Sequence, residues 1–111
     1  MINHAREKYR KLASDIMLNY PEANFCVRCI GWDYKNGKYL FVDDEAGREY
    51  PITEEQIAEA LPKVRQMMAE RKLFLFGLDS SEEHFMDGCN WDSISIDAVV
   101  QVVLFGEVIY G

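Results

Sequence analysis

Apolar residues recur at steps of three and four near the start of the chain, which is the spacing of one helix face. The positions are Ile2, Ala5, Tyr9, Leu12, Ala13, Ile16 and Met17. Asn3 can cap the first turn with its side chain. Pro21 ends the helical geometry, because the residue before a proline is pushed out of it. We therefore predict a helix over residues 3–19.

Two strands are predicted next, at residues 25–34 and 38–43, and the dipeptide Asn36-Gly37 lies between them. Asn-Gly favours a type I′ turn, in which both central residues need a positive φ. A type I′ turn at this position sets the pairing of the two strands. The predicted pairs are Tyr34 with Tyr39, Asp33 with Leu40, Trp32 with Phe41, and Gly31 with Val42.

This pairing sorts the side chains of the hairpin onto two faces, because directly opposed residues share a face. One face is predicted to hold an aromatic cluster, the candidate interaction surface of the chain: Trp32, Tyr34, Tyr39 and Phe41. The other face is predicted to hold Val27, Cys29, Gly31, Leu40 and Val42.

A second turn at Glu45-Ala46-Gly47 leads to a short strand over residues 48–52. Pro51 has no N–H group to donate to a neighbouring strand, so this strand should lie at an edge. The region is thus expected to form a three-stranded antiparallel meander. If helices leave one face of it uncovered, the apolar area on that face should contact another protein.

The next helix begins after Thr53, since Thr53 and Gln56 fit a capping box. Its apolar stripe consists of Ile57, Leu61, Val64, Met67 and Met68. Pro62 interrupts the stripe and leaves two alternatives. Either one helix kinks there, or a second helix begins with Pro62 in its first turn.

Residues 72–79, with the sequence KLFLFGLD, are continuously apolar and short, which predicts a buried strand. A polar loop follows. The valines and isoleucines of residues 93–105 favour a strand by propensity. Asp92 as a cap and Gly106 as a stop favour a helix, and we choose the helix, with residues 107–110 extended.

These elements predict a single α+β domain over residues 1–111, which is an ordinary length for one domain. The predicted order is an N-terminal helix, a three-stranded antiparallel meander, a helix, a buried strand, and a C-terminal helix with an extended tail. Hydrophobic residues make up 49% of the chain and charged residues 28%, which argues against an intrinsically disordered protein.

Charge and hydropathy narrow the expected partners and location. The net charge is −7, and only the first helix concentrates basic residues, so we expect no nucleic-acid partner. The longest apolar-rich run, residues 98–105, is too short to cross a bilayer, so we expect no membrane partner. The N-terminal residues lack the apolar core of a signal peptide, which predicts a cytoplasmic protein.

The three cysteines raise the question of a metal or redox site. Cys26 and Cys29 form a CxxC pair, but residues three apart in a strand point to opposite faces. We therefore expect Cys26, Cys29 and Cys89 to be structural thiols, with no bound metal or cofactor. The alternative is a metal- or thiol-dependent protein that uses these cysteines together with His84.

A second candidate site is the acidic loop at residues 79–92. It gathers carboxylates, a histidine and a thiol: Asp79, Glu82, Glu83, His84, Asp87, Cys89 and Asp92. Loops often carry function, so this one could form a small-molecule binder or a hydrolase. The simpler interpretation is a solvated loop anchored by Phe85, Met86 and Trp91.

No recognisable catalytic motif is present, so the sequence favours a non-enzymatic protein that works through protein contacts. A homodimer is expected for three reasons. The C-terminal twenty residues are strongly apolar, the edge strand with Pro51 could pair with another chain, and the basic first helix could attract the acidic C-terminal third across a two-fold axis. The alternative is a monomer whose C-terminal segment fills the core of its own domain.

Overall fold

The structure, a computed structural model, describes residues 4–18 and 27–109. Its elements are α1 (His4–Met17), β1 (Arg28–Asp33), β2 (Lys38–Asp43), β3 (Arg48–Thr53), α2 (Glu54–Ala69), α3 (Glu82–Phe85), the short 3-10 helix η2 (Gly88–Asn90) and α4 (Ser93–Phe105). The predicted α+β class is confirmed. Asn3, Pro21, Cys26 and Tyr110, which the sequence prediction used, lie outside the described residues.

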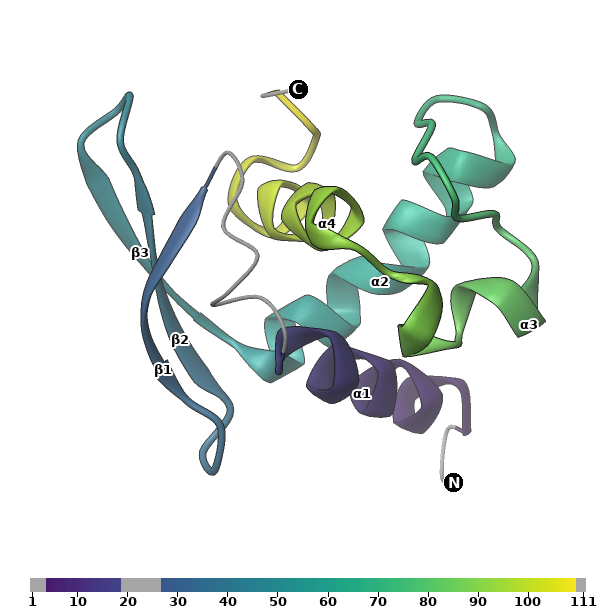
Figure 1. Cartoon of the computed structure of the whole chain (residues 1–111), viewed down its shortest axis with the longest axis horizontal. Coiled ribbons are helices and arrows are strands. Elements are labelled where there is room, and N and C mark those ends of the chain that lie inside the picture. The colour runs from purple at the N-terminus through teal and green to yellow at the C-terminus, as the bar shows by residue number, and fades with distance from the viewer. Residues whose placement is uncertain (1–3, 19–26, 110–111) are drawn as a thin grey trace.

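The helices lie together on one side of the sheet (Figure 1). Helix α4 is buried nearly all round, from Ser95 to Val102, which is typical of a helix at the centre of a core. The choice of a helix for this segment is confirmed. Asp92 accepts a hydrogen bond from the Ser95 N–H group, and Gly106 ends the helix with a φ of 78°. Residues 107–109 then continue in neither a helix nor a strand.

Helices α1 and α2 contribute the remaining helical core. Their fully or largely buried residues are Leu12, Ala13, Ile16 and Met17 on α1, and Ile57, Ala58, Leu61 and Val64 on α2. The capping box of Thr53 and Gln56 is formed as predicted. One helix runs through Pro62, so the alternative in which a second helix begins there is wrong.

Two buried polar residues on α4 tie distant segments together. Asp97 Oδ1 accepts a hydrogen bond from the Val27 N–H group at 3.0 Å, and Asp97 Oδ2 accepts one from Gln101 Nε2 at 2.6 Å. Gln101 Oε1 in turn accepts from the Ile109 N–H group at 2.9 Å. Since buried polar groups are stable only when hydrogen-bonded, this chain of contacts holds the start of β1 and the C-terminal segment against α4.

The hairpin forms, but its predicted register is wrong by two residues. The observed pairs are Asp33 with Lys38, Trp32 with Tyr39, and Gly31 with Leu40. Residues 34–37 form a four-residue loop in which Gly37 has a φ of 61°. Asn36 is not among the described residues with a positive φ, so the turn is not type I′.

The side chain of Asp33 explains the longer loop. Its Oδ1 accepts from the Asn36 N–H group at 3.2 Å, and its Oδ2 accepts from Asn36 Nδ2 at 2.8 Å. Such side-chain contacts to the backbone stabilise a turn that a dipeptide rule does not include.

One predicted face assignment is also wrong. The register shifts between Cys29 and Gly31, so a bulge at Ile30 places Cys29 opposite Phe41 rather than on the face of Leu40 and Val42. The inner face, which we define as the one toward the helices, therefore includes Cys29, Trp32, Tyr39, Phe41 and Ile52.

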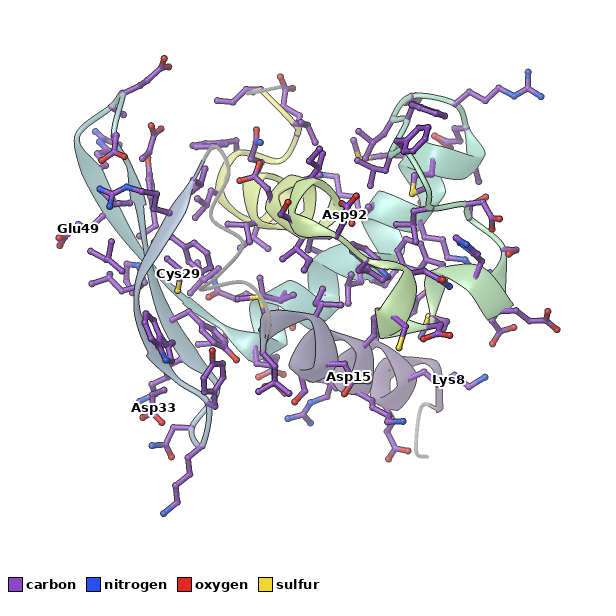
Figure 2. The ribbon with its side chains drawn as sticks, in the orientation of Figure 1. Lys8, Asp15, Cys29, Asp33, Glu49 and Asp92 are labelled. Carbon is purple, nitrogen blue, oxygen red and sulfur yellow. The ribbon has the colours of Figure 1, made fainter. Side chains whose placement is uncertain are left out.

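The outer face of the sheet is the opposite one, and no described helix covers it (Figure 1). It consists of three rows of paired residues: Arg28, Val42 and Glu49; Gly31, Leu40 and Pro51; and Asp33, Lys38 and Thr53. Strand β3 lies at an edge, as Pro51 predicts. Figure 2 shows Glu49 pointing away from the helices.

Residues 72–79 do not form the predicted buried strand. They form a loop with a turn at Phe76 and Gly77. Only part of the run is buried, because Leu75 and Leu78 enter the core while Phe74 and Phe76 point outward into solvent. No helix of the described chain is long and apolar enough to cross a membrane.

Candidate functional site

The most unusual surface feature is the loop between α2 and α3 that carries Phe74 and Phe76. The two residues are 83% and 82% exposed, more than any other large hydrophobic residue that the structure describes. Leaving a phenylalanine in water forgoes about 1.5–3 kcal/mol of burial free energy. Two exposed rings on one short loop therefore mark it as a candidate binding site.

The backbone of this loop is anchored at its start. Arg71, two residues beyond the end of α2, has a φ of 60°, and it is the one described residue other than glycine with a positive φ. The N–H groups of Lys72 and Leu73 both donate to the Met67 carbonyl, at 2.8 and 3.3 Å. These contacts turn the chain sharply back after the helix.

The loop is also anchored from within. Leu75, between the two phenylalanines, and Leu78, after them, are buried, and the Leu78 N–H group donates to the Leu75 carbonyl at 3.1 Å. Gly77 has a φ of 79°, a conformation that side chains rarely adopt. A buried leucine thus alternates with exposed phenylalanines, and Phe74 and Phe76 point outward from an ordered backbone. We call residues 71–77 the aromatic loop.

The predicted aromatic cluster on the hairpin is divided between core and surface. Tyr39 and Phe41 are buried under the helices, and burial raises the pKa of Tyr39 to about 12. Trp32 remains 52% exposed, and Tyr34 is also exposed, with its ring 6.1 Å from that of Tyr39. Only Trp32 and Tyr34 could therefore contact a partner from this cluster.

The acidic loop uses its carboxylates to build turns. Asp79 Oδ1 accepts from both the N–H group and the hydroxyl of Ser81, and these hydrogen bonds hold the pKa of Asp79 below its usual value. Asp87 accepts from the Cys89 N–H group. Glu82 pairs with Lys8 at 2.8 Å, which lowers the pKa of Glu82.

The other residues of this segment also have structural contacts. His84 Nδ1 accepts from the Asp79 N–H group at 3.2 Å. Trp91 is buried and donates from its indole N–H to the Phe85 carbonyl at 2.8 Å, with the two rings 5.0 Å apart. Phe85 and Trp91 thus anchor the segment in the core, as the simpler interpretation of the loop predicts.

The cysteines that the structure describes lie in unlike surroundings. Cys29 is buried on the inner face of the sheet, where burial raises the pKa of its thiol, whereas Cys89 is exposed in η2. Within residues 4–18 and 27–109, no three His, Cys, Asp or Glu side chains are grouped so that they could hold a metal ion. Cys26 lies outside those ranges.

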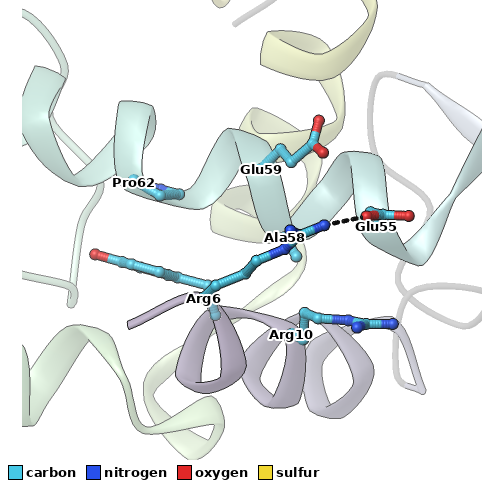
Figure 3. Close-up of a pocket in the computed structure, with 7 residues that line it drawn as sticks. Arg6, Arg10, Glu55, Ala58, Glu59 and Pro62 are labelled. Carbon is cyan, nitrogen blue, oxygen red and sulfur yellow. Dashed lines mark hydrogen bonds and ion pairs between the residues drawn. The ribbon is translucent and has the colours of Figure 1, made fainter. Parts of the chain in front are cut away.

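A groove of about 480 Å³ runs between α1 and α2 (Figure 3). Its lining residues are Arg6, Tyr9, Arg10, Glu55, Ala58, Glu59 and Pro62. An ion pair joins Arg6 to Glu55 across the groove, as the dashed line in Figure 3 shows. Since bases and acids are balanced here, the groove shows no charge preference for an anion or a cation.

Sequence reasoning missed the aromatic loop, because an apolar run is normally assigned to the core. The available signal was the pair of phenylalanines alternating with leucines just before Gly77. Comparison of the chain with protein-family models, with curated proteins and with solved structures finds no match in any of the three.

Proposed function

We propose that this protein is a non-enzymatic interaction module that binds another protein through the aromatic loop. The observation that carries the proposal is the exposure of Phe74 and Phe76, 83% and 82%, on an anchored backbone. Aromatic side chains that enter pockets of a partner are typical binding hot spots. An ordered loop supports this role, because less conformational entropy is lost on binding.

The surroundings of the two rings indicate the chemistry of the partner. Arg71 is exposed, and no hydrogen bond or ion pair of its side chain is found among the described residues. Lys72 is paired with Glu70 at 3.1 Å. A partner surface with apolar pockets and an acidic rim would therefore complement the loop.

A membrane surface is the competing kind of partner for exposed phenylalanines. The net charge of −7 opposes binding to anionic lipids, whereas a protein surface can be locally complementary to the loop. We therefore favour a protein partner.

The test compares three purified baits: wild type, the variant Phe74→Ser/Phe76→Ser, and Ile94→Ser. Ile94 is 48% exposed on α4 and serves as the control for losing apolar surface elsewhere. Candidate partners captured from extract are purified and titrated by calorimetry. We expect at least one captured protein to bind wild type and Ile94→Ser with equal affinity. The same protein should bind the double variant at least about 30-fold more weakly, since hot spots contribute about 2 kcal/mol or more.

Thermal denaturation checks that the double variant remains folded. We expect little change, because surface substitutions are usually within about 0.5 kcal/mol. Partners that bind all three baits equally would contradict the proposal. Binding of wild type to phosphatidylcholine–phosphatidylserine vesicles, lost in the double variant, would replace the protein partner with a membrane.

A further inference from the structure

The outer face of the sheet is a second candidate surface, independent of the aromatic loop. We propose that two copies of this chain form a dimer in which their outer faces contact each other. The two-fold axis of this dimer lies between the two sheets and is parallel to β2. The face is open in the described chain, since every helix lies on the other side of the sheet (Figure 1). The occupant we infer is a second copy, because the charges of the face complement themselves.

The centre of the face is apolar. Leu40 lies between Gly31 and Pro51 on the neighbouring strands, and Val42 lies one row further along β2. Both side chains remain partly exposed although they stand in the middle strand. Rotation about an axis along β2 would place Leu40 against the partner's Leu40 and remove both from water.

The charges flanking this centre have opposite signs on the two outer strands. Arg28 on β1 and Glu49 on β3 both lie in the row of Val42. The rotation exchanges the outer strands, so Arg28 would face the partner's Glu49, and Glu49 would face the partner's Arg28. Each favourable contact thus occurs twice, as two-fold symmetry requires.

The donors and acceptors needed for these contacts are present. Arg28 binds Asp44 through Nε and Nη2 at 2.7 and 2.9 Å, which leaves further N–H groups of its guanidinium for a second carboxylate. Glu49 is exposed, and no described residue pairs with its carboxylate. At the other end of the face, Lys38 would meet the partner's Lys38, but each lies directly opposite Asp33 of its own chain.

The area of the outer face determines how strongly the two copies are expected to associate. Three strands of six residues, spaced at about 4.8 Å with about 3.4 Å per residue, present a plan area of about 300 Å². A standard interface buries roughly 800 Å² per partner. We therefore expect a weak, rapidly exchanging dimer, which is populated at high protein concentration.

The test is sedimentation equilibrium from micromolar to near-millimolar concentration. Wild type should shift from monomer to dimer mass. Arg28→Glu or Glu49→Arg alone should weaken association about tenfold, because each places like charges together twice. The combined variant Arg28→Glu/Glu49→Arg should restore it. Lys63→Glu, an exposed charge reversal on α2 and outside the sheet, is the matched control and should associate like wild type.

Two further variants separate this inference from the proposed function. Leu40→Lys should abolish association, whereas Phe74→Ser/Phe76→Ser should leave it intact. A monomer mass for wild type throughout the range would overturn the inference. The inference would also be overturned if the combined variant Arg28→Glu/Glu49→Arg did not regain association. It would be overturned as well if Phe74→Ser/Phe76→Ser lost association. Circular dichroism of each variant confirms that it is folded.

Discussion

At the scale of single residues, Cys29 and Cys89 differ in the two properties that control thiol reactivity. Cys29 is buried, its thiol lies 3.4 Å from the Gly31 carbonyl oxygen, and burial raises its pKa, whereas Cys89 is exposed. Because the thiolate is the reactive form, a buried thiol with a raised pKa reacts slowly. We expect iodoacetamide to alkylate Cys89 in the folded protein and Cys29 only after unfolding.

Peptide mass spectrometry measures both rates. Trypsin cleaves after Arg28, so Cys26 and Cys29 fall in separate peptides and their labels are distinguished. A urea-unfolded sample, in which all three thiols react, is the control. Equal rates at Cys29 and Cys89 in the folded protein would mean that the inner face of the sheet opens readily.

At the scale of elements, Gly37 has a defined part in the hairpin. Its φ is 61°, and a Cβ atom there would lie 3.1 Å from the Glu54 Cβ atom. The Gly37 carbonyl also accepts from the Glu54 N–H group at 2.8 Å, which joins the loop to the start of α2. We expect Gly37→Ala to lower the free energy of unfolding by about 1–3 kcal/mol.

Urea denaturation measures this loss, and Gly31→Ala is the matched control. Gly31 lies in β1 without a positive φ, and a Cβ atom there would meet the Leu40 Cβ atom at an ordinary 3.6 Å. If the two variants unfolded at the same urea concentration, the left-handed conformation of Gly37 would not be what the loop requires.

The elements that the sequence predicts well are those with local signals at their ends. Asp92 and Gly106 correctly favoured a helix for α4 against the strand propensity of its valines, because a capping contact and a left-handed stop are short-range interactions. The capping box at Thr53 located the start of α2 for the same reason.

The features that the sequence could not predict depend on specific side-chain and backbone contacts, which neither hydropathy nor the turn dipeptide encodes. The hairpin register followed the side chain of Asp33 rather than the Asn36-Gly37 dipeptide. The segment at residues 72–79 has the composition of a buried strand, but the Met67 carbonyl binds the N–H groups at its start and turns it into a loop. Hydropathy assigns Phe74 and Phe76 to a core, so it conceals the candidate site.

At the scale of the whole molecule, we expect surface carboxylates to make the free energy of unfolding depend on pH. Hydrogen bonds lower the pKa of five of them, each through a different main partner: Asp33 through Asn36, Asp44 through Arg28, Glu70 through Lys72, Asp79 through Ser81, and Glu82 through Lys8. A lowered pKa in the folded state means that the unfolded state binds protons first as the pH falls.

These carboxylates therefore contribute fully to the free energy of unfolding above their ordinary pKa values, about 4. The contribution is lost as the pH falls through their lower pKa values in the folded state. We expect the urea midpoint to be lower at about pH 3 than at about pH 5. Equal midpoints at the two pH values would show that these contacts do not stabilise the fold.

The central position of α4 has a consequence for the order of folding during synthesis. Asp97 binds the Val27 N–H group across 70 residues of chain, and α4 supplies the middle of the core. A ribosome makes the sheet and α2 before α4, so the inner face of the sheet has no complete core to join until residues 93–105 emerge. We therefore expect the inner face of the sheet and the side of α2 that packs on α4 to remain accessible to water until α4 is made, and chaperones that bind apolar surfaces could recognise the chain at that stage.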